Sequence, residues 1–202
     1  MIIVFARAPV PGEAKTRLVP RLGAWGAARL HARLTLHALR IARLAEDSVE
    51  LHGTRRHSFF RNLKVRFRLQ RGRDLGERMQ RAMAKALRRH GCVILIGSDC
   101  PMLTPADLRR AARWLRGGCD VVLAPAEDGG YALIAARRLK PEFFKEIRWG
   151  GAGVYDETVR KLAAAGYRWR VLRRLWDVDR PEDLERLRWL RFASAARRGA
   201  RR

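Results

Sequence analysis

The chain has 202 residues, of which 48% are hydrophobic, and its 44 Lys and Arg outnumber its 20 Asp and Glu to give a net charge of +24. This length and apolar content fit one globular domain and exclude a disordered chain. No apolar run approaches the roughly 18 residues that cross a membrane, and the first residues lack the basic region of a signal peptide. Three cysteines without a Cys-x-x-Cys spacing predict neither a disulfide framework nor a structural zinc site. We therefore expect a cytoplasmic protein with no membrane span.

The positive charge comes from 38 Arg and 6 Lys that are spread along the whole chain. Such a balance raises nucleic acid as a partner, but no RNA-binding or helix-turn-helix motif accompanies it. We interpret it as a generally basic surface that attracts anionic substrates, and we expect no specific nucleic-acid partner. A basic tail, 191–202, is predicted to follow a single domain over 1–190.

Strands and helices are predicted to alternate along the chain. The expected strands lie at 2–6, 48–52, 65–69, 93–96, 120–124, 131–135 and 167–172. The expected helices lie at 23–45, 74–89, 154–165, from 104 and from 179. The run Val93–Ile96 is apolar throughout, as in a strand buried on both faces, and the 23–45 segment repeats apolar residues every three or four positions. The alternation predicts an α/β fold, a Rossmann-like three-layer α/β/α sandwich with a mostly parallel sheet.

The loop after the first strand, 7–17, is the first of four polar clusters at the expected carboxyl edge of the sheet. Pro9, Pro11 and Gly12 exclude a helix there, and such a kinked loop can turn backbone N–H groups toward an anion. Its cations are suited to phosphate oxygens. The loop residues that we predict to bind nucleotide phosphate are Arg7, Ala8, Pro11, Gly12, Lys15 and Arg17. An ordinary basic surface loop is the alternative.

The other three clusters supply carboxylates and glycines. Ser98 and Asp99 directly follow a buried strand, where a carboxylate suits Mg²⁺, although a turn-capping Asp would look the same. Gly129 and Gly130 precede a strand and would let a ligand approach the backbone closely, or would simply form a tight turn.

The last cluster contains Asp177 and Asp179, which share a face in an extended segment, so that one of them could complete a metal site with Asp99. Asp179 with Glu182 also fits a helix-capping box.

The strings FARAPVPGEAKTRL, DLGERM, IGSDCPMLTP, PAEDGGYAL and WDVDRPEDL resemble those of the nucleotide-diphospho-sugar transferase superfamily, which has the glycosyltransferase A fold. Within it they are similar to a bacterial glycosyltransferase family linked by name to arsenosugar biosynthesis. They also resemble 2-phospholactate guanylyltransferase. The resemblance covers about residues 2 to 187. It implies a metal-dependent transferase that uses a nucleotide sugar or a nucleoside triphosphate together with a small-molecule acceptor.

The resemblance also implies roles for individual residues. Lys15 and Arg17 would hold the nucleotide phosphates, and Asp99 would bind a divalent metal. Beyond the resemblance, we predict that Ser98 also contacts phosphate and that Asp179 joins Asp99 in holding Mg²⁺ or Mn²⁺. The expected catalytic residues are Asp99, Lys15 and Asp128. The expected substrate-binding residues are Asp128, Gly129, Gly130 and Trp149.

Two departures from these families keep the reaction open. Ser98-Asp99-Cys100 supplies one carboxylate where many glycosyltransferases carry Asp-x-Asp, and Gly150-Gly151 follows Trp149 where related chains tend to have Ser or Thr. Glycosyl transfer is our first prediction. Nucleotidyl transfer with release of pyrophosphate is the alternative, and a non-catalytic basic module that binds nucleotide or nucleic acid is a third. The oligomeric state is left open, a homodimer included.

Overall fold

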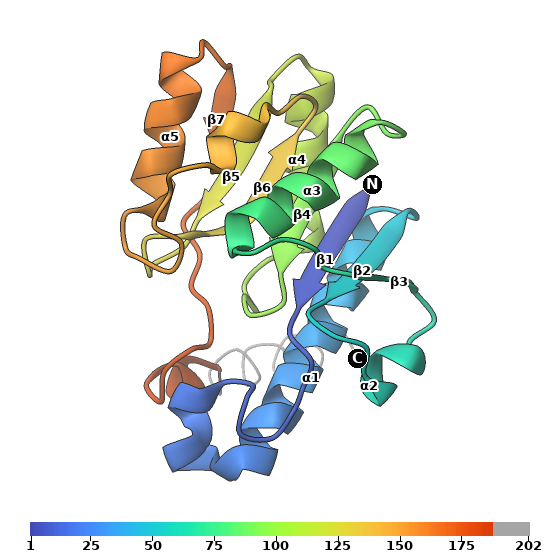
Figure 1. Cartoon of the computed structure of the whole chain (residues 1–202), viewed down its shortest axis with the longest axis vertical. Helices are drawn as coiled ribbons and strands as arrows, with labels where there is room; N and C mark the ends of the chain where they lie inside the picture. The colour runs from blue at the N-terminus through green and yellow to red at the C-terminus, as the bar shows by residue number, and fades with distance from the viewer. Residues whose placement is uncertain (188–202) are drawn as a thin grey trace, which may run out of the picture.

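The computed structural model describes residues 1–187, and the predicted tail at 191–202 lies outside them. The strands are β1 (Ile2–Ala6), β2 (Val49–Gly53), β3 (Arg66–Leu69), β4 (Val93–Gly97), β5 (Val121–Pro125), β6 (Tyr131–Ala136) and β7 (Trp169–Val171). The helices are α1 (Val19–Ala45), α2 (Ser58–Arg61), α3 (Leu75–Leu87), α4 (Pro105–Arg116) and α5 (Val154–Ala164), with short 3-10 helices at Thr16–Leu18 and Pro141–Phe144. The strands form one sheet in the order β3-β2-β1-β4-β6-β5-β7 (Figure 1).

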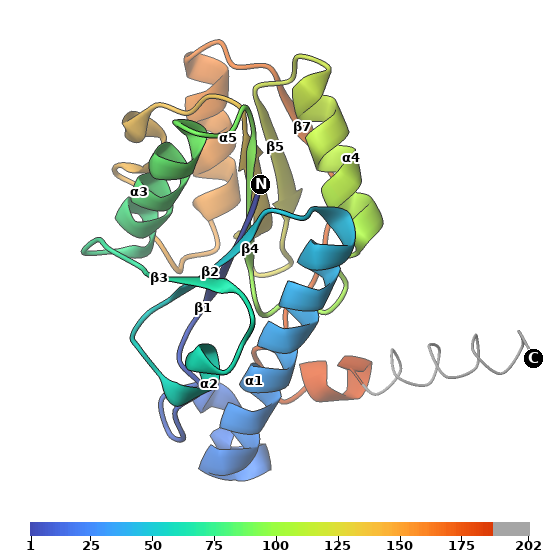
Figure 2. The ribbon, with the colours of Figure 1, turned by 90° about the vertical axis from the view of Figure 1, so that its right-hand side faces the viewer.

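Helices cover both faces of this sheet. Viewed along the sheet edge, α1 and α4 lie on one side and α3 and α5 on the other (Figure 2). Each side has its own apolar core, and alternate residues of the central strands contribute to each: Ile2 and Val4 face α1, whereas Ile3 and Phe5 face α3. The predicted three-layer α/β/α fold is confirmed.

The sheet is mostly parallel, as predicted, but one strand departs from the pattern. Among the described strands, β6 alone runs opposite to its neighbours, pairing antiparallel with both β4 and β5. β5 and β6 are therefore joined by a tight turn at 126–130 rather than by a crossover helix. Parallel strands need a long connection, and five residues are too few to provide one.

The capping residues set where the helices begin. The Asp74 carboxylate accepts the backbone N–H of Glu77 at 2.8 Å, so α3 starts at Leu75. Thr104 and Asp107 form a reciprocal capping box at α4, with Pro105 in its first turn.

The predicted box between Asp179 and Glu182 is not what the structure shows. Asp183 instead accepts the backbone N–H groups of Asp179 and Arg180, at 2.9 and 2.7 Å, and the helical segment starts at residue 183 rather than 179. In α1, a short helical segment at 19–22 precedes the predicted helix, and a kink at Gly23, where φ is +68°, separates the two. No helix within residues 1–187 is long and apolar enough to cross a membrane.

A fully buried carboxylate, Asp120, ties the far end of the sheet together. It accepts hydrogen bonds from Arg138 at 2.8 and 2.9 Å, from Arg137 at 3.0 Å and from the Arg168 backbone at 3.0 Å. The guanidinium of Arg138 holds the pKa of the Asp120 carboxyl well below its ordinary value, against the effect of burial. This network joins the start of β5 to the end of β6 and to the residue that precedes β7.

We expect Asp120→Asn to lower the free energy of unfolding by about 3 kcal/mol at pH 7, because it leaves buried donors without a charged acceptor. A carboxyl group whose pKa is lower in the folded than in the unfolded state stabilises the fold at pH values above its unfolded-state pKa. This contribution is lost as the pH falls through the folded-state pKa. Urea unfolding of both proteins at pH 7 and pH 3 should show the difference shrinking at pH 3. An unchanged difference would mean that charge plays no part.

Candidate active site at the carboxyl edge of the sheet

The four predicted clusters meet where β1 and β4 end. In the segment 176–179, Trp176 and Val178 pack against Leu18, which follows the first loop, and against Leu34 in α1. The Val178 backbone N–H also donates to the Asp99 carbonyl at 3.0 Å. Residues that are about 80 or 160 positions apart in the sequence therefore surround one site, as the edge of a parallel sheet predicts.

Lys15 lies at the centre of this site. Its ammonium Nζ is 2.9 Å from Asp99 Oδ2 and 3.8 Å from Asp179 Oδ1, and its side chain is only 5% exposed. The backbone of Lys15 is left-handed, with φ +53°, a conformation uncommon for a residue with a side chain. Strain of this kind costs of the order of 1–3 kcal/mol and persists only where surrounding contacts impose it. The loop is thus shaped to place a buried cation between two carboxylates.

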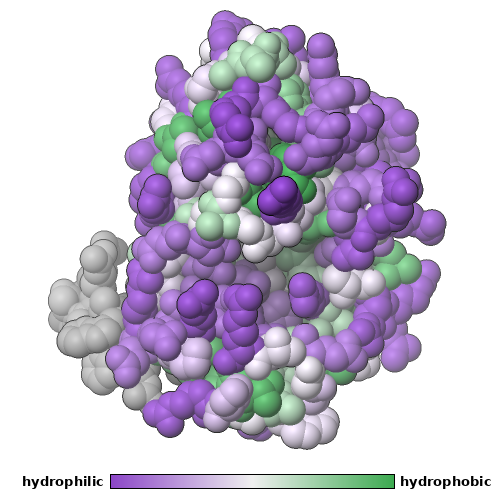
Figure 3. Space-filling model, turned by 60° about the vertical axis from the view of Figure 1, so that its left-hand side comes forward, coloured by the Kyte–Doolittle hydropathy of each residue, from purple (hydrophilic) through white to green (hydrophobic). Residues whose placement is uncertain are grey.

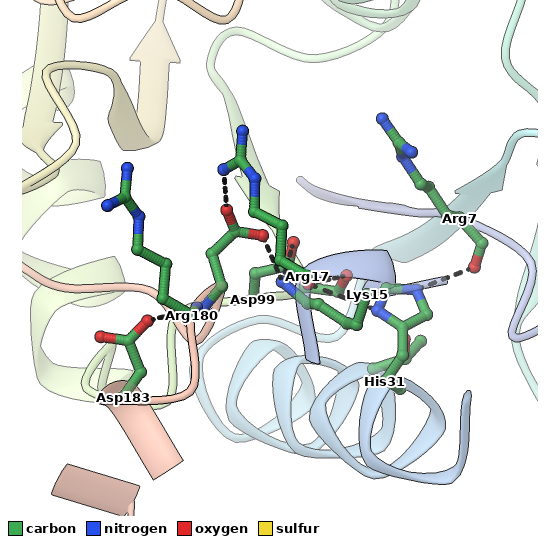
Figure 4. A network of polar contacts seen from close by, with 10 residues as sticks. Arg7, Lys15, Arg17, His31, Asp99, Arg180 and Asp183 are labelled. Carbon is green, nitrogen blue, oxygen red and sulfur yellow. Dashed lines mark hydrogen bonds and ion pairs between the residues drawn. The ribbon is translucent and has the colours of Figure 1, made fainter. Parts of the chain in front are cut away.

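Arg17 and Asp179 form a second ion pair beside Lys15. Figure 4 shows Lys15 and Arg17 next to Asp99, with His31 below them on α1. The Arg17 side chain is 66% exposed, so most of its N–H donors face solvent. The structure therefore brings together Lys15, Arg17, Asp99 and Asp179, four of the residues singled out from the sequence.

His31 also belongs to the site, although no sequence motif points to it. It is 3% exposed; its ring Nε2 lies 3.0 Å from the Arg7 carbonyl and its Nδ1 lies 3.4 Å from Asp99 Oδ1. A carbonyl oxygen only accepts, so Nε2 carries a proton and donates to Arg7. One buried ring thus contacts both the loop after β1 and the carboxylate after β4.

Asp99 is held in its ionised form. Burial alone would raise the pKa of the Asp99 carboxyl, but the charge of Lys15 is the strongest opposing effect, and that pKa is held well below its ordinary value. The Ser98 hydroxyl donates to Asp99 Oδ1 at 3.2 Å. Ser98 itself is buried, so in the structure it orients Asp99. Its predicted contact with a phosphate stays a prediction.

A pocket of about 260 Å³ opens beside Asp99. Its wall includes Asp128, Gly130, Trp149 and Asp177. Burial and the nearby charge of Asp128 raise the pKa of Asp177 to about 6, and Asp99 adds to this effect. Carboxylates from three separate loops therefore crowd one pocket. Figure 3 shows a hollow across the middle of one face, with less polar surface inside it and hydrophilic residues around it.

The glycine turn after β5 forms part of this wall by close backbone packing. Gly129 has φ +85°, and a Cβ there would lie 1.9 Å from the Ala152 carbonyl oxygen. Its own carbonyl accepts the Tyr155 N–H at 2.9 Å, and Asp128 accepts the Gly130 N–H at 2.9 Å. Trp149 packs closely over Gly76, where a Cβ would meet its indole nitrogen at 2.2 Å.

In the described part of the chain, the other residues of the predicted phosphate loop form no hydrogen bond or ion pair with Lys15 or Asp99. The Ala8 N–H is taken by the Thr54 hydroxyl at 3.2 Å, Pro11 has no N–H, and Gly12 is exposed with φ +79°. The Arg7 guanidinium lies apart from the Lys15–Asp99 pair and extends to the same side as that of Arg17 (Figure 4). The structure thus collects the charged side chains of Lys15 and Arg17, and the phosphate contacts predicted for the other loop residues stay predictions.

The predicted metal ligands, Asp99 and Asp179, both contact Lys15, which lies between them. Within residues 1–187 there is no group of three or more His, Cys, Asp or Glu side chains that could hold a metal ion. Mg²⁺ needs only one or two protein carboxylates when substrate phosphates complete its shell. The site is therefore one that could hold a metal jointly with a phosphate ligand.

Comparison with known proteins agrees with this fold. A structure from Desulfovibrio desulfuricans G20, provisionally named a nucleotide-diphospho-sugar transferase, is 34% identical with a TM-score of 0.82, over 89% of this chain and 81% of that one. CMP:2-keto-3-deoxy-manno-octonic acid synthetase complexed with CTP is 16% identical with a TM-score of 0.61, over 96% and 98%. Rv0371c of Mycobacterium tuberculosis H37Rv in complex with manganese is 22% identical with a TM-score of 0.55, over 92% and 96%.

The fold is thus that of nucleotide-using transferases. Comparison with curated proteins gave no match. Residues 35–151, more than half of the chain, match a bacterial family, and the chain belongs to it: the family described as "Uncharacterized protein conserved in bacteria (DUF2064)".

Proposed function

We propose that this protein is a metal-dependent glycosyltransferase whose donor is a nucleotide-diphospho-sugar. The observation that carries the proposal is the meeting of Lys15, Arg17 and Asp99 beside a pocket with two further carboxylates. A diphosphate carries the negative charge that these cations can balance, and the pocket offers room for the transferred group or its acceptor. The 34% identical relative supports the same donor class.

Lys15 and Arg17 would bind the diphosphate. An ammonium has three donors, and Lys15 directs two of them toward Asp99 and Asp179, which leaves one for a phosphate oxygen. The Arg17 guanidinium uses one of its five N–H donors for Asp179, which leaves four for the diphosphate. These groups are already positioned, so they would stabilise charge that develops on the leaving phosphate without rearranging.

The carboxylates present fit a hard divalent cation, Mg²⁺ or Mn²⁺. Asp99 is ionised, and burial together with repulsion from the nearby charges of Asp128 and Asp99 raises the pKa of Asp177 to about 6. A cation bound there would relieve this repulsion and, when present, would offset charge on the leaving phosphates. Asp177 lines the pocket with Asp99, whereas Asp179 is occupied by Arg17 and Lys15. We therefore assign Asp177, ahead of Asp179, as the second metal ligand.

Asp128 and Trp149 would serve the acceptor side. Asp128 is exposed and lines the pocket, and its Oδ1 is fixed by the Gly130 N–H. A carboxylate held in this way can accept a proton from an acceptor hydroxyl as general base. Trp149 and Gly130 line the pocket, and Gly129 packs against the 150–153 turn, part of which lines it as well.

Nucleotidyl transfer is the second candidate, because Asp99 is the single carboxylate directly after β4 where a sugar transferase often has two. Incubation with nucleotide sugars and with nucleoside triphosphates, each with Mg²⁺ and a panel of acceptors, separates the two reactions. Glycosyl transfer releases a nucleoside diphosphate. Release of pyrophosphate from a triphosphate would refute the glycosyltransferase assignment.

Asp177→Asn is expected to weaken Mn²⁺ binding, measured by electron paramagnetic resonance with nucleotide present, by at least about tenfold, because it removes one charged ligand. Asp179→Asn is the matched control and should change the affinity less. It removes the same charge, but from a carboxylate that is already paired with Arg17 and Lys15. The reverse order of effects would restore Asp99 and Asp179 as the metal pair.

His31→Phe is expected to lower kcat about tenfold with a smaller change in KM, since residues that orient metal ligands are worth about 10- to 100-fold. His31→Gln keeps an N–H near the Arg7 carbonyl and should recover part of the loss. If Phe and Gln lower kcat equally, the contact with Arg7 is irrelevant and His31 serves only to fill space.

A further inference from the structure

A second pocket lies away from the candidate active site, on the face of β2 and β3 beside α3. Its volume is about 330 Å³, and it shares no lining residue with the pocket at Asp99. Six cationic side chains line it: Arg56, Arg68, Arg71, Arg78, Arg81 and Lys85. They come from the loops after β2 and β3, from β3 itself and from α3, so the fold gathers them from four segments.

Part of this charge is fixed in place by a buried carboxylate. Glu50 on β2 is 8% exposed and accepts from Arg68 Nε at 2.6 Å and lies 3.0 Å from His52 Nε2. Arg68, which lines the pocket, is thereby held through its Nε, which leaves its terminal N–H donors for a ligand. A pre-oriented guanidinium is suited to planar, bidentate contacts with phosphate.

Most of the positive charge at the rim remains unbalanced. Arg81 is paired with Glu77 at 2.5 Å and Arg78 donates to the Gly72 carbonyl at 3.0 Å. Within residues 1–187, the side chains of Arg56 and Lys85 have no hydrogen-bond or ion-pair partner. Like charges concentrated in a concave site raise the local positive potential and attract multivalent anions.

We propose that this β2–β3 pocket binds a small molecule that carries two or more phosphate groups. The excess of cations over carboxylates calls for a multivalent anion, and the volume is that of a small-ligand site. Gln70 lines the pocket and ties it to β1, because its amide donates to the carbonyls of Ala6 and His52 at 3.3 and 2.8 Å. Ala6 ends β1 and precedes the Lys15 loop, so the occupant would lie next to the strand that leads into the candidate active site.

Isothermal titration with inorganic tripolyphosphate, without divalent metal, tests the proposal. The double variant Arg56→Ala/Lys85→Ala removes two exposed cations from the pocket and is expected to weaken binding at least about tenfold, the loss of one or more charge-assisted hydrogen bonds. The matched control, Arg110→Ala/Arg116→Ala on α4, removes the same charge elsewhere and should change the affinity less than threefold. Thermal melting checks that both variants fold.

The Lys15→Ala variant separates this site from the proposed donor site. It should keep tripolyphosphate binding at the β2–β3 pocket even if nucleotide binding is lost. Three results would overturn the proposal: an equal loss in the α4 control, which would indicate general charge attraction; a loss in Lys15→Ala with none in the Arg56/Lys85 variant; or binding of an RNA oligonucleotide with none of tripolyphosphate.

Discussion

Replacement of Asp99 by Asn is expected to lower kcat/KM roughly a thousandfold, because removing a metal-holding charge costs about 4 kcal/mol of transition-state stabilisation. Asn has the same shape as Asp, and the Asp99 side chain is 40% exposed, so the fold should survive. Initial rates with the nucleotide donor and Mg²⁺ measure the effect, and thermal melting confirms folding.

Asp156→Asn on α5 is a suitable control for Asp99→Asn, because it removes one exposed carboxylate outside the pocket. It should leave kcat/KM within about twofold, as surface changes usually do. If Asp99→Asn retained more than a tenth of the activity, Asp99 would not be a metal ligand, and its ion pair with Lys15 would be purely structural.

Gly129→Ala is expected to lower the free energy of unfolding by about 4 kcal/mol, combining the cost of a left-handed alanine with that of a clash against packed backbone. The new Cβ would lie 1.9 Å from the Ala152 carbonyl oxygen, which belongs to a turn and cannot swing aside as a side chain could. Urea unfolding measures the loss. Binding of acceptor should also weaken, because the displaced turn lines the pocket.

Gly150→Ala provides the control for Gly129→Ala. Gly150 also has a positive φ, +88°, but a Cβ there meets nothing within 4 Å. It should therefore show the conformational cost alone, about 1 kcal/mol. Equal losses at the two positions would contradict the close packing of the glycine turn on the 150–153 segment.

Local signals predicted the elements well, because they act over a few residues. The Thr104 cap, Pro105 and the apolar run Val93–Ile96 each placed an element within two residues of its observed start. The direction of β6 was not predictable in the same way. The apolar run Tyr131–Ala136 looks the same in a parallel or an antiparallel strand, and only the short turn after β5 fixes its direction.

The site was predicted in part, and the missing residues have a common cause. Lys15 and Asp99 follow strands whose carboxyl ends meet, so their proximity follows from the order of elements. His31 lies on the buried face of a long helix, and its distance to Asp99 depends on how α1 packs. The raised pKa of Asp177 depends on burial and on Asp128, which comes from another loop. Such long-range packing leaves no local pattern in the sequence.

The central claim is that a nucleotide binds at Lys15 and Arg17 together with a divalent metal. Isothermal titration with a panel of nucleotide sugars and triphosphates, with and without Mg²⁺, tests it most directly. We predict binding of at least one nucleotide sugar that strengthens with Mg²⁺ and is lost in Lys15→Ala. Nucleotide binding that is indifferent to Mg²⁺, persists in Lys15→Ala and falls steeply with salt would contradict it and would identify a basic binding module instead.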